Sequence, residues 1–172
     1  MASLIENLIE VLDKESSEYE VLLGLSMKKT PIIIKGDLEE LQKITDEEQL
    51  VVSRIGGLEK TRTQVMKDIA NVMNRDVTQL KLTNLIQMLA SRPAESGKLA
   101  ELHDRLKNVT ANMQRVNEQN RQLIENALEM VEFDMNLLQS VKTAPETANY
   151  NKGAYTSGAL MGVGRSGFDA KQ

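Results

Sequence analysis

Apolar residues recur at seven-residue spacing in three long stretches of this chain, and this periodicity constrains the fold more than any other feature. Residues three and four positions apart lie on one face of an α-helix, and a strict heptad favours helices that pack side by side with a slow left-handed twist. The three ladders are Ile5, Leu12, Tyr19 and Ile33, with Leu8 and Leu22 beside them; Ile44, Val51, Leu58, Val65 and Val72, with Leu41, Glu48, Ile55, Arg62 and Ile69 beside them; and Leu102, Val109, Val116, Leu123, Met130 and Leu137, with Leu99, Leu106, Met113, Asn120, Ala127, Asp134 and Val141 beside them. The pattern predicts long helices that bury their seams against one another or against a partner, and it favours binding over catalysis.

Composition supports helices and excludes several other classes of protein. The 172 residues suffice for one domain or one bundle, and the 3% of aromatic residues is low for a β-sandwich. Cysteine is absent, so neither a disulfide nor a thiolate zinc site can form. The net charge of −4 gives no basic stripe for nucleic acid. The amphipathic N-terminus is unlike a signal peptide and no stretch is long and apolar enough to span a bilayer, so we expect a soluble cytoplasmic protein.

Two positions in the first half of the chain are expected to interrupt or end a helix. Pro31 lacks the N–H that a helix interior needs, so we expect it to kink or end the first helix near Thr30. Gly36 suits a left-handed helix C-terminus and Asp37 suits the N-cap of the next helix. The second helix is then expected to run to about Asn74. It contains Gly56-Gly57, which either permits a close helix crossing or allows a bend.

The second half predicts a short helix over Leu80–Ala90 and a last long helix over about Gly97–Val141. Residues 91–97 between them are predicted to be a connector, although Pro93 could also be a first helical residue. Residues 144–172 have no apolar period, and we expect a flexible Gly-rich tail. The predicted fold is therefore all-α: an elongated antiparallel bundle of three long helices with a short connecting helix. The predicted domains are a helical domain over residues 1–143 and the tail over 144–172.

Sequence features that could indicate a catalytic or ligand-binding site have simpler explanations here. Residues 162–167 match a G-x-G-x-x-G pattern but follow no strand, so dinucleotide binding is not expected. His103 has no second ligand at helical spacing and is expected on the surface. No set of nucleophile, base and orienting group can be named, so we expect no enzyme activity, no cofactor and no metal.

Polar residues interrupt the apolar ladders at four positions, namely Glu48, Arg62, Asn120 and Asp134. One interpretation is that the seam rotates and places these side chains at its edge, because a heptad drifts on a straight helix. The other is that they fix the register between helices or await a partner. The sequence leaves both interpretations open.

The C-terminal half of the last helix gives the strongest indication of binding. Its apolar residues cover more than half of the circumference, so more than one side must be buried. They are Leu123, Ile124, Ala127, Leu128, Met130, Val131, Met135, Leu137 and Leu138. One stripe can pack internally while another accepts a partner helix. A fully buried core helix or a homodimer seam would use the same residues.

Five stretches of the sequence resemble the FlgN family of flagellar export chaperones, and the resemblance covers about residues 4–141. The stretches are Tyr19-x-x-Leu22-Leu23-x-Leu25-Ser26-x-Lys28-Lys29, Gly36-Asp37-Leu38-Glu39-x-Leu41, Glu48-x-Leu50, Ile55-x-x-Leu58-Glu59-x-x-Arg62, and Val116-Asn117-x-x-Asn120-Arg121-x-Leu123-Ile124-x-x-Ala127-Leu128. The resemblance implies a cytosolic type III secretion chaperone. Such a chaperone captures the apolar C-terminal helices of hook-filament junction proteins and delivers them to the export gate.

The resemblance also implies where the partners bind. Cargo binding maps to about residues 119–141 and includes Leu123, Ile124, Ala127, Leu128, Met130, Val131, Met135 and Leu138. Docking at the cytoplasmic domain of the export gate is implied for an aromatic residue of the tail, for which Tyr150 and Tyr155 are the candidates. A homo-oligomer in the absence of cargo is left open. The alternative function is a structural coiled-coil scaffold that self-associates through its heptad seams.

Overall fold

The computed structural model describes residues 2–143, and every regular element over these residues is helical. In order, the elements are α1 (Ala2–Lys35), α2 (Leu38–Val72), the 3-10 helix η1 (Val77–Gln79), α3 (Leu82–Met88) and α4 (Pro93–Thr143). The chain divides into two units, residues 1–130 and 131–172, and the second is described only over 131–143, the end of α4. The all-α fold class is confirmed. The predicted tail, 144–172, lies outside the described residues, so the domain division at 143 stays a prediction.

The boundary between α1 and α2 forms as the sequence predicts. Gly36 adopts a φ of +69° and donates its N–H to the carbonyl of Ile33 at 3.1 Å, while Asp37 donates to Ile32 at 3.3 Å. These two bonds satisfy the last carbonyls of α1 in a Schellman motif. The Asp37 carboxylate then accepts the N–H of Glu40 at 3.1 Å and caps α2. One glycine and one aspartate thus reverse the chain.

Pro31 does not end the first helix near Thr30, and that alternative is wrong. α1 continues through Pro31 to Lys35. The proline removes only the hydrogen bond to the carbonyl of Met27, and both residues are exposed, so water can solvate that carbonyl. Ile33, which is buried, holds the last turn against the core.

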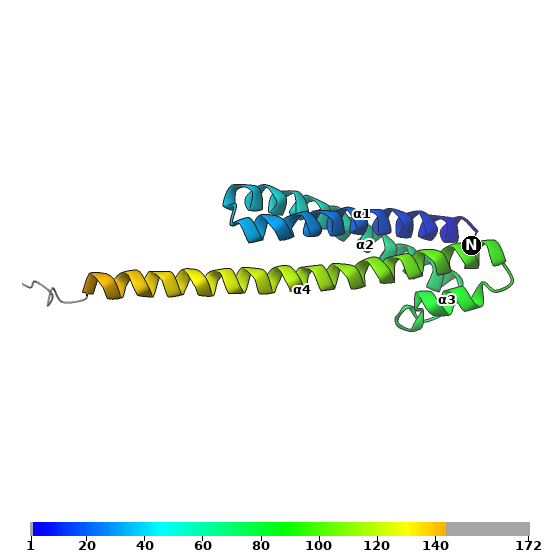
Figure 1. Ribbon diagram of the computed structural model, residues 1–172. Helices are drawn as coiled ribbons and strands as arrows, with labels where there is room; N and C mark the ends of the chain where they lie inside the picture. The colour runs from blue at the N-terminus through cyan, green and yellow to red at the C-terminus, as the bar shows by residue number, and fades with distance from the viewer. Residues whose placement is uncertain (1, 144–172) are drawn as a thin grey trace, which may run out of the picture. The chain divides into compact units, whose positions relative to one another are not determined.

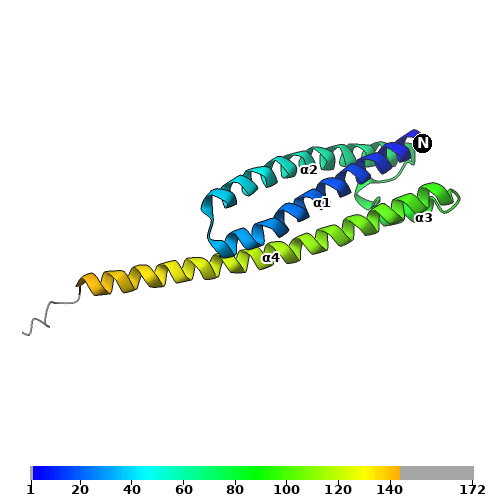
Figure 2. The same ribbon diagram turned by 45° about the horizontal axis from the view of Figure 1, so that its top comes forward.

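The first unit has two hydrophobic cores along its length. One lies where the N-terminal part of α1 meets the C-terminal part of α2, α3 and the start of α4; the other lies nearer the α1–α2 turn (Figures 1 and 2). The fully buried residues of the first core are Ile5, Leu8, Leu12, Ile69, Ala70, Leu85 and Leu99. The second core contains Leu22, Leu25, Ile44, Val51, Ile55 and Met113. The predicted heptad ladders supply most of both cores.

Polar contacts fix the directions of the helices within this unit. The contacts between α1 and α2 are Glu15–Arg62, Glu18–Arg54 and Lys29–Glu48, whose numbers run in opposite order, so the two helices are antiparallel. From α1 to α4, Asp13 pairs with Arg105, and Thr30 bonds to Asn120. These numbers rise together, so α1 and this part of α4 run in the same direction.

The glycine pair in α2 does not mark a close helix crossing. A Cβ atom added to Gly56 or Gly57 would meet no atom of a neighbouring element within 4 Å. α2 is one helix from Leu38 to Val72, so both residues lie in its interior. Their hydrogen side chains are therefore not required by packing.

Replacing Gly56 and Gly57 by alanine is expected to stabilise the protein by about 1 kcal/mol for each substitution, because alanine loses less backbone entropy in a helix. Urea unfolding followed by circular dichroism would measure the change in midpoint. Gly36→Ala is the matched control, and it is expected to destabilise, because its φ of +69° strains an alanine. A lower midpoint for the Gly56 and Gly57 variants would show that α2 needs flexibility there.

Candidate functional site

Burial along α4 changes abruptly after Asn120. Leu99, Met113 and Asn120 of one ladder are buried and Leu106 is half-buried, but the same ladder is exposed at Ala127, Asp134 and Val141. Leu123 and Ile124 are half-buried, and every residue from Glu125 to Thr143 is exposed. The apolar ladder of α4 therefore extends further along the sequence than the part that is buried against the other helices.

Of the predicted cargo-binding residues, Leu123 and Ile124 are half-buried, and the other six lie on the exposed part of α4. In the first unit, Leu128 and Met130 are exposed by 59% and 69%. In the second unit, which is described by itself, the exposed apolar residues are Val131, Phe133, Met135, Leu137, Leu138 and Val141. No described residue buries these side chains, so a partner or a second copy could cover them. The predicted set omitted Phe133, Leu137 and Val141, although helical spacing from Met130 and Leu138 indicates all three.

Two of the polar ladder residues bond specifically to α1 and do not lie loosely at a seam edge. The carboxylate of Glu48 accepts hydrogen bonds from Ser26 at 3.0 Å and from Lys29 at 2.7 Å. The buried Asn120 side chain donates to the carbonyl of Ser26 at 2.8 Å and accepts from the Thr30 hydroxyl at 2.7 Å. Such matched bonds favour a single register, as the second interpretation predicted.

Arg62 is the third polar ladder residue, and it bonds to the buried Glu15 across the α1–α2 seam. Its guanidinium lies 2.7 Å from one carboxylate oxygen of Glu15, while the other oxygen has no hydrogen-bond partner among the described residues. Burial raises the pKa of Glu15, and the charge of Arg62 opposes that shift. The pair is therefore a polar contact between the two apolar cores.

Asp134 is the exception among the four residues. It is exposed, and its carboxylate makes no ion pair or hydrogen bond with any described residue. Its neighbours at helical spacing, Val131, Leu137 and Leu138, are exposed and apolar. Asp134 thus lies in the middle of an apolar face.

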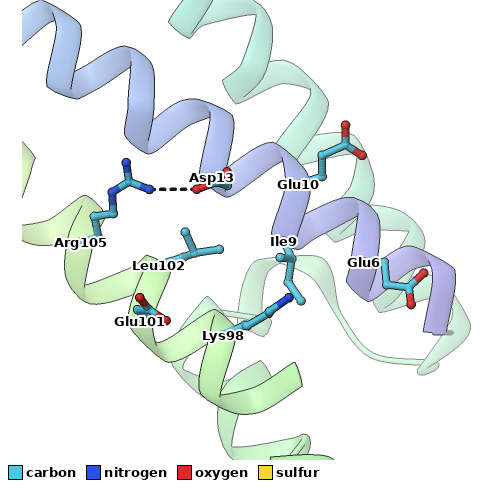
Figure 3. Close-up of a pocket in the computed structure, with 8 residues that line it drawn as sticks. All are labelled: Glu6, Ile9, Glu10, Asp13, Lys98, Glu101, Leu102 and Arg105. Carbon is cyan, nitrogen blue, oxygen red and sulfur yellow. Dashed lines mark hydrogen bonds and ion pairs between the residues drawn. The ribbon is translucent and has the colours of Figure 1, made fainter. Parts of the chain in front are cut away.

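A second candidate is the depression of about 480 Å³ between the N-terminal part of α1 and α4. Figure 3 shows that Ile9 and Leu102 lie at its centre and that Arg105 reaches Asp13 across it. Arg105 also bonds to Glu20, and this bond lowers the pKa of that carboxyl group. Some polar groups of the depression therefore already pair with one another. We interpret the depression as a groove between α1 and α4 that the ion pairs of Arg105 cross.

The remaining sequence motifs add no chemical site to the described residues. His103 is part-exposed and lies 3.1 Å from Asp104. Residues 2–143 contain no group of His, Cys, Asp and Glu that could hold a metal ion, and no helix among them is long and apolar enough to cross a membrane. Tyr150, Tyr155 and the G-x-G-x-x-G pattern lie outside the described range.

Comparison with known proteins identifies the family. A family model described as "FlgN protein" matches residues 1–158. The chain belongs to the FlgN family. This membership confirms the resemblance and indicates a flagellar export chaperone.

One relative is similar to this chain over most of its length. The chain is 26% identical over 144 residues to the "Uncharacterized protein YvyG" of Bacillus subtilis (strain 168), and the match covers 84% of this chain and 83% of that protein. No solved structure is significantly similar to this FlgN chain.

Proposed function

We propose that this FlgN-family protein is a cytoplasmic chaperone that binds the C-terminal helices of flagellar hook-filament junction proteins and delivers them to the export gate. The observation that carries the proposal is the exposed apolar face of α4 after Asn120. Exposed apolar surface of this extent marks an interaction site. We further propose that the three long helices form the antiparallel bundle that the sequence predicts, and that the protein has no enzymatic role.

Physical chemistry supports a helix as the ligand. The face has the i, i+3, i+4 and i+7 spacing that an amphipathic helix recognises. Methionines at 130 and 135 adapt to different apolar partners. A chaperone that covers the seam of an unassembled helix stabilises its soluble state by mass action, and it can release that helix if the interface is modest.

Delivery to the gate is assigned to the tail. Tyr150 or Tyr155 would contact the cytoplasmic domain of the gate, and a second weak contact raises the effective concentration of cargo there. A pull-down from flagellated cells with the chain truncated after residue 143 tests this step. Loss of gate components with retention of junction proteins is expected.

The alternative is a scaffold that self-associates through the same apolar face. Sedimentation velocity with and without a peptide of the junction-protein C-terminal helix distinguishes the two functions. A shift to a one-to-one complex is expected. A stable self-assembled state that the peptide does not change would overturn the chaperone proposal.

A further inference from the structure

Two carboxylates in the α1–α2 seam are each paired with a basic side chain of the opposite helix. Glu15 on α1 pairs with Arg62 on α2, and Glu48 on α2 pairs with Lys29 on α1, each at 2.7 Å. The neutral Asn120 pairs instead with a hydroxyl and a carbonyl. The cause is general: a carboxylate that leaves water without a counter-charge costs several kcal/mol or becomes protonated.

Asp134 occupies the same kind of position without such a partner. It follows Asn120 by two heptads on one ladder, and Val131, Leu137 and Leu138 surround it. No basic residue occurs between Arg121 and Lys142. Any helix that covers this face removes the Asp134 carboxylate from water, and this segment of α4 has no cation to compensate.

We propose that the helix bound to the C-terminal part of α4 carries a lysine or arginine at the seam position opposite Asp134. The inference rests on the proposed function and adds a rule for the cargo: an apolar stripe interrupted by one basic residue. Charge complementarity also argues against a second copy of this chain. The acidic residues of the segment 122–141 are Glu125, Glu129, Glu132 and Asp134, so two such segments bring like charges together.

The proposal is tested by whether one substitution weakens or tightens binding of a peptide. The probe is a peptide of the junction-protein C-terminal helix, and its affinity for the full chain is measured by isothermal titration calorimetry. If a cation faces Asp134, then Asp134→Leu leaves that cation buried without a partner, and binding weakens by about tenfold. If no cation is present, Asp134→Leu removes a desolvation cost and adds apolar area, so binding tightens.

Two further measurements complete the design. Asp134→Asn is expected to weaken binding and to reduce the salt dependence of the affinity, because one charge pair is lost. Glu132→Gln is the matched control, since residue 132 lies on the opposite side of the helix from 134, and it is expected to change affinity less than twofold. Deletion of residues 144–172 is expected to leave the effect of Asp134→Leu intact.

Three other outcomes would overturn either this inference or the proposed function. Unchanged or tighter binding by Asp134→Leu overturns this inference, while the binding itself upholds the proposed function. An effect that disappears with residues 144–172 assigns the cation to the chain's own C-terminal segment and overturns the inference. Failure of the wild-type chain to bind the peptide overturns the proposed function and the inference together.

Discussion

Replacing Leu128 and Val131 by aspartate is expected to abolish capture of the junction-protein peptide, with affinity lowered by about a hundredfold or more. Burial of a leucine or valine side chain contributes about 1.5–3 kcal/mol, and about 1.4 kcal/mol corresponds to a factor of ten in affinity. The two introduced carboxylates would also lose water on binding. Calorimetry measures the affinity, and far-UV circular dichroism checks that the helix content is unchanged.

The chain offers a closely matched control for this variant. Leu50 and Val52 on α2 are exposed by 64% and 53%, against 59% and 54% for Leu128 and Val131. Leu50→Asp with Val52→Asp introduces the same charges at the same residue types and is expected to leave capture intact. If the Leu128 and Val131 variant loses helicity, or if both variants lose capture equally, the apolar face of α4 is not the cargo site.

Replacing Arg62 by alanine is expected to destabilise the protein by about 3 kcal/mol at pH 7, because the buried carboxylate of Glu15 loses its counter-charge. Arg54→Ala is the control: Arg54 is exposed and its partner Glu18 is half-buried, so their ion pair is expected to contribute only about 1 kcal/mol. Leucine at both 15 and 62 is expected to restore stability to within about 1 kcal/mol of wild type. Equal losses for the two arginine variants would contradict a special role for the buried pair.

The loss of stability caused by Arg62→Ala is expected to depend on pH in a defined direction. Burial raises the pKa of Glu15 above its ordinary value of 4.5, so the contribution of Glu15 to stability is greatest below that value and falls as pH rises through the folded pKa. Removal of Arg62 raises this pKa further. The difference in unfolding free energy between variant and wild type is therefore expected to be smaller at pH 4 than at pH 7. A difference of the same size at both pH values would show that Glu15 is not the cause.

Local signals in the sequence predict much of the fold. Gly36 and Asp37 predict the α1–α2 turn because glycine tolerates the left-handed conformation and aspartate caps a helix. Pro93 is the first residue of α4, as one of the two interpretations of the connector allowed. Of the two alternatives for Pro31, the one in which it ends the first helix was wrong. A proline costs a helix one hydrogen bond, and the exposed position of Met27 lets water replace it here.

The sequence could not tell which part of α4 is buried. Asn120 and Asp134 share one ladder, and nothing local separates a residue that bonds to α1 from one that does not. The answer depends on where α1 ends. Thr30 lies opposite Asn120 and α1 runs in the same direction for only five more residues, so its last residue lies level with about Glu125. The exposed face of α4 follows from this difference in helix length.

The loss of burial after Asn120 has a practical consequence for mutational studies. A library scored by expression level or melting temperature reports on residues that fold the chain, and side chains from Glu125 to Thr143 support no core. Such a screen would rate most substitutions there as harmless. Export defects in this segment would thus come from well-folded variants, and only an assay that includes the client protein would detect them.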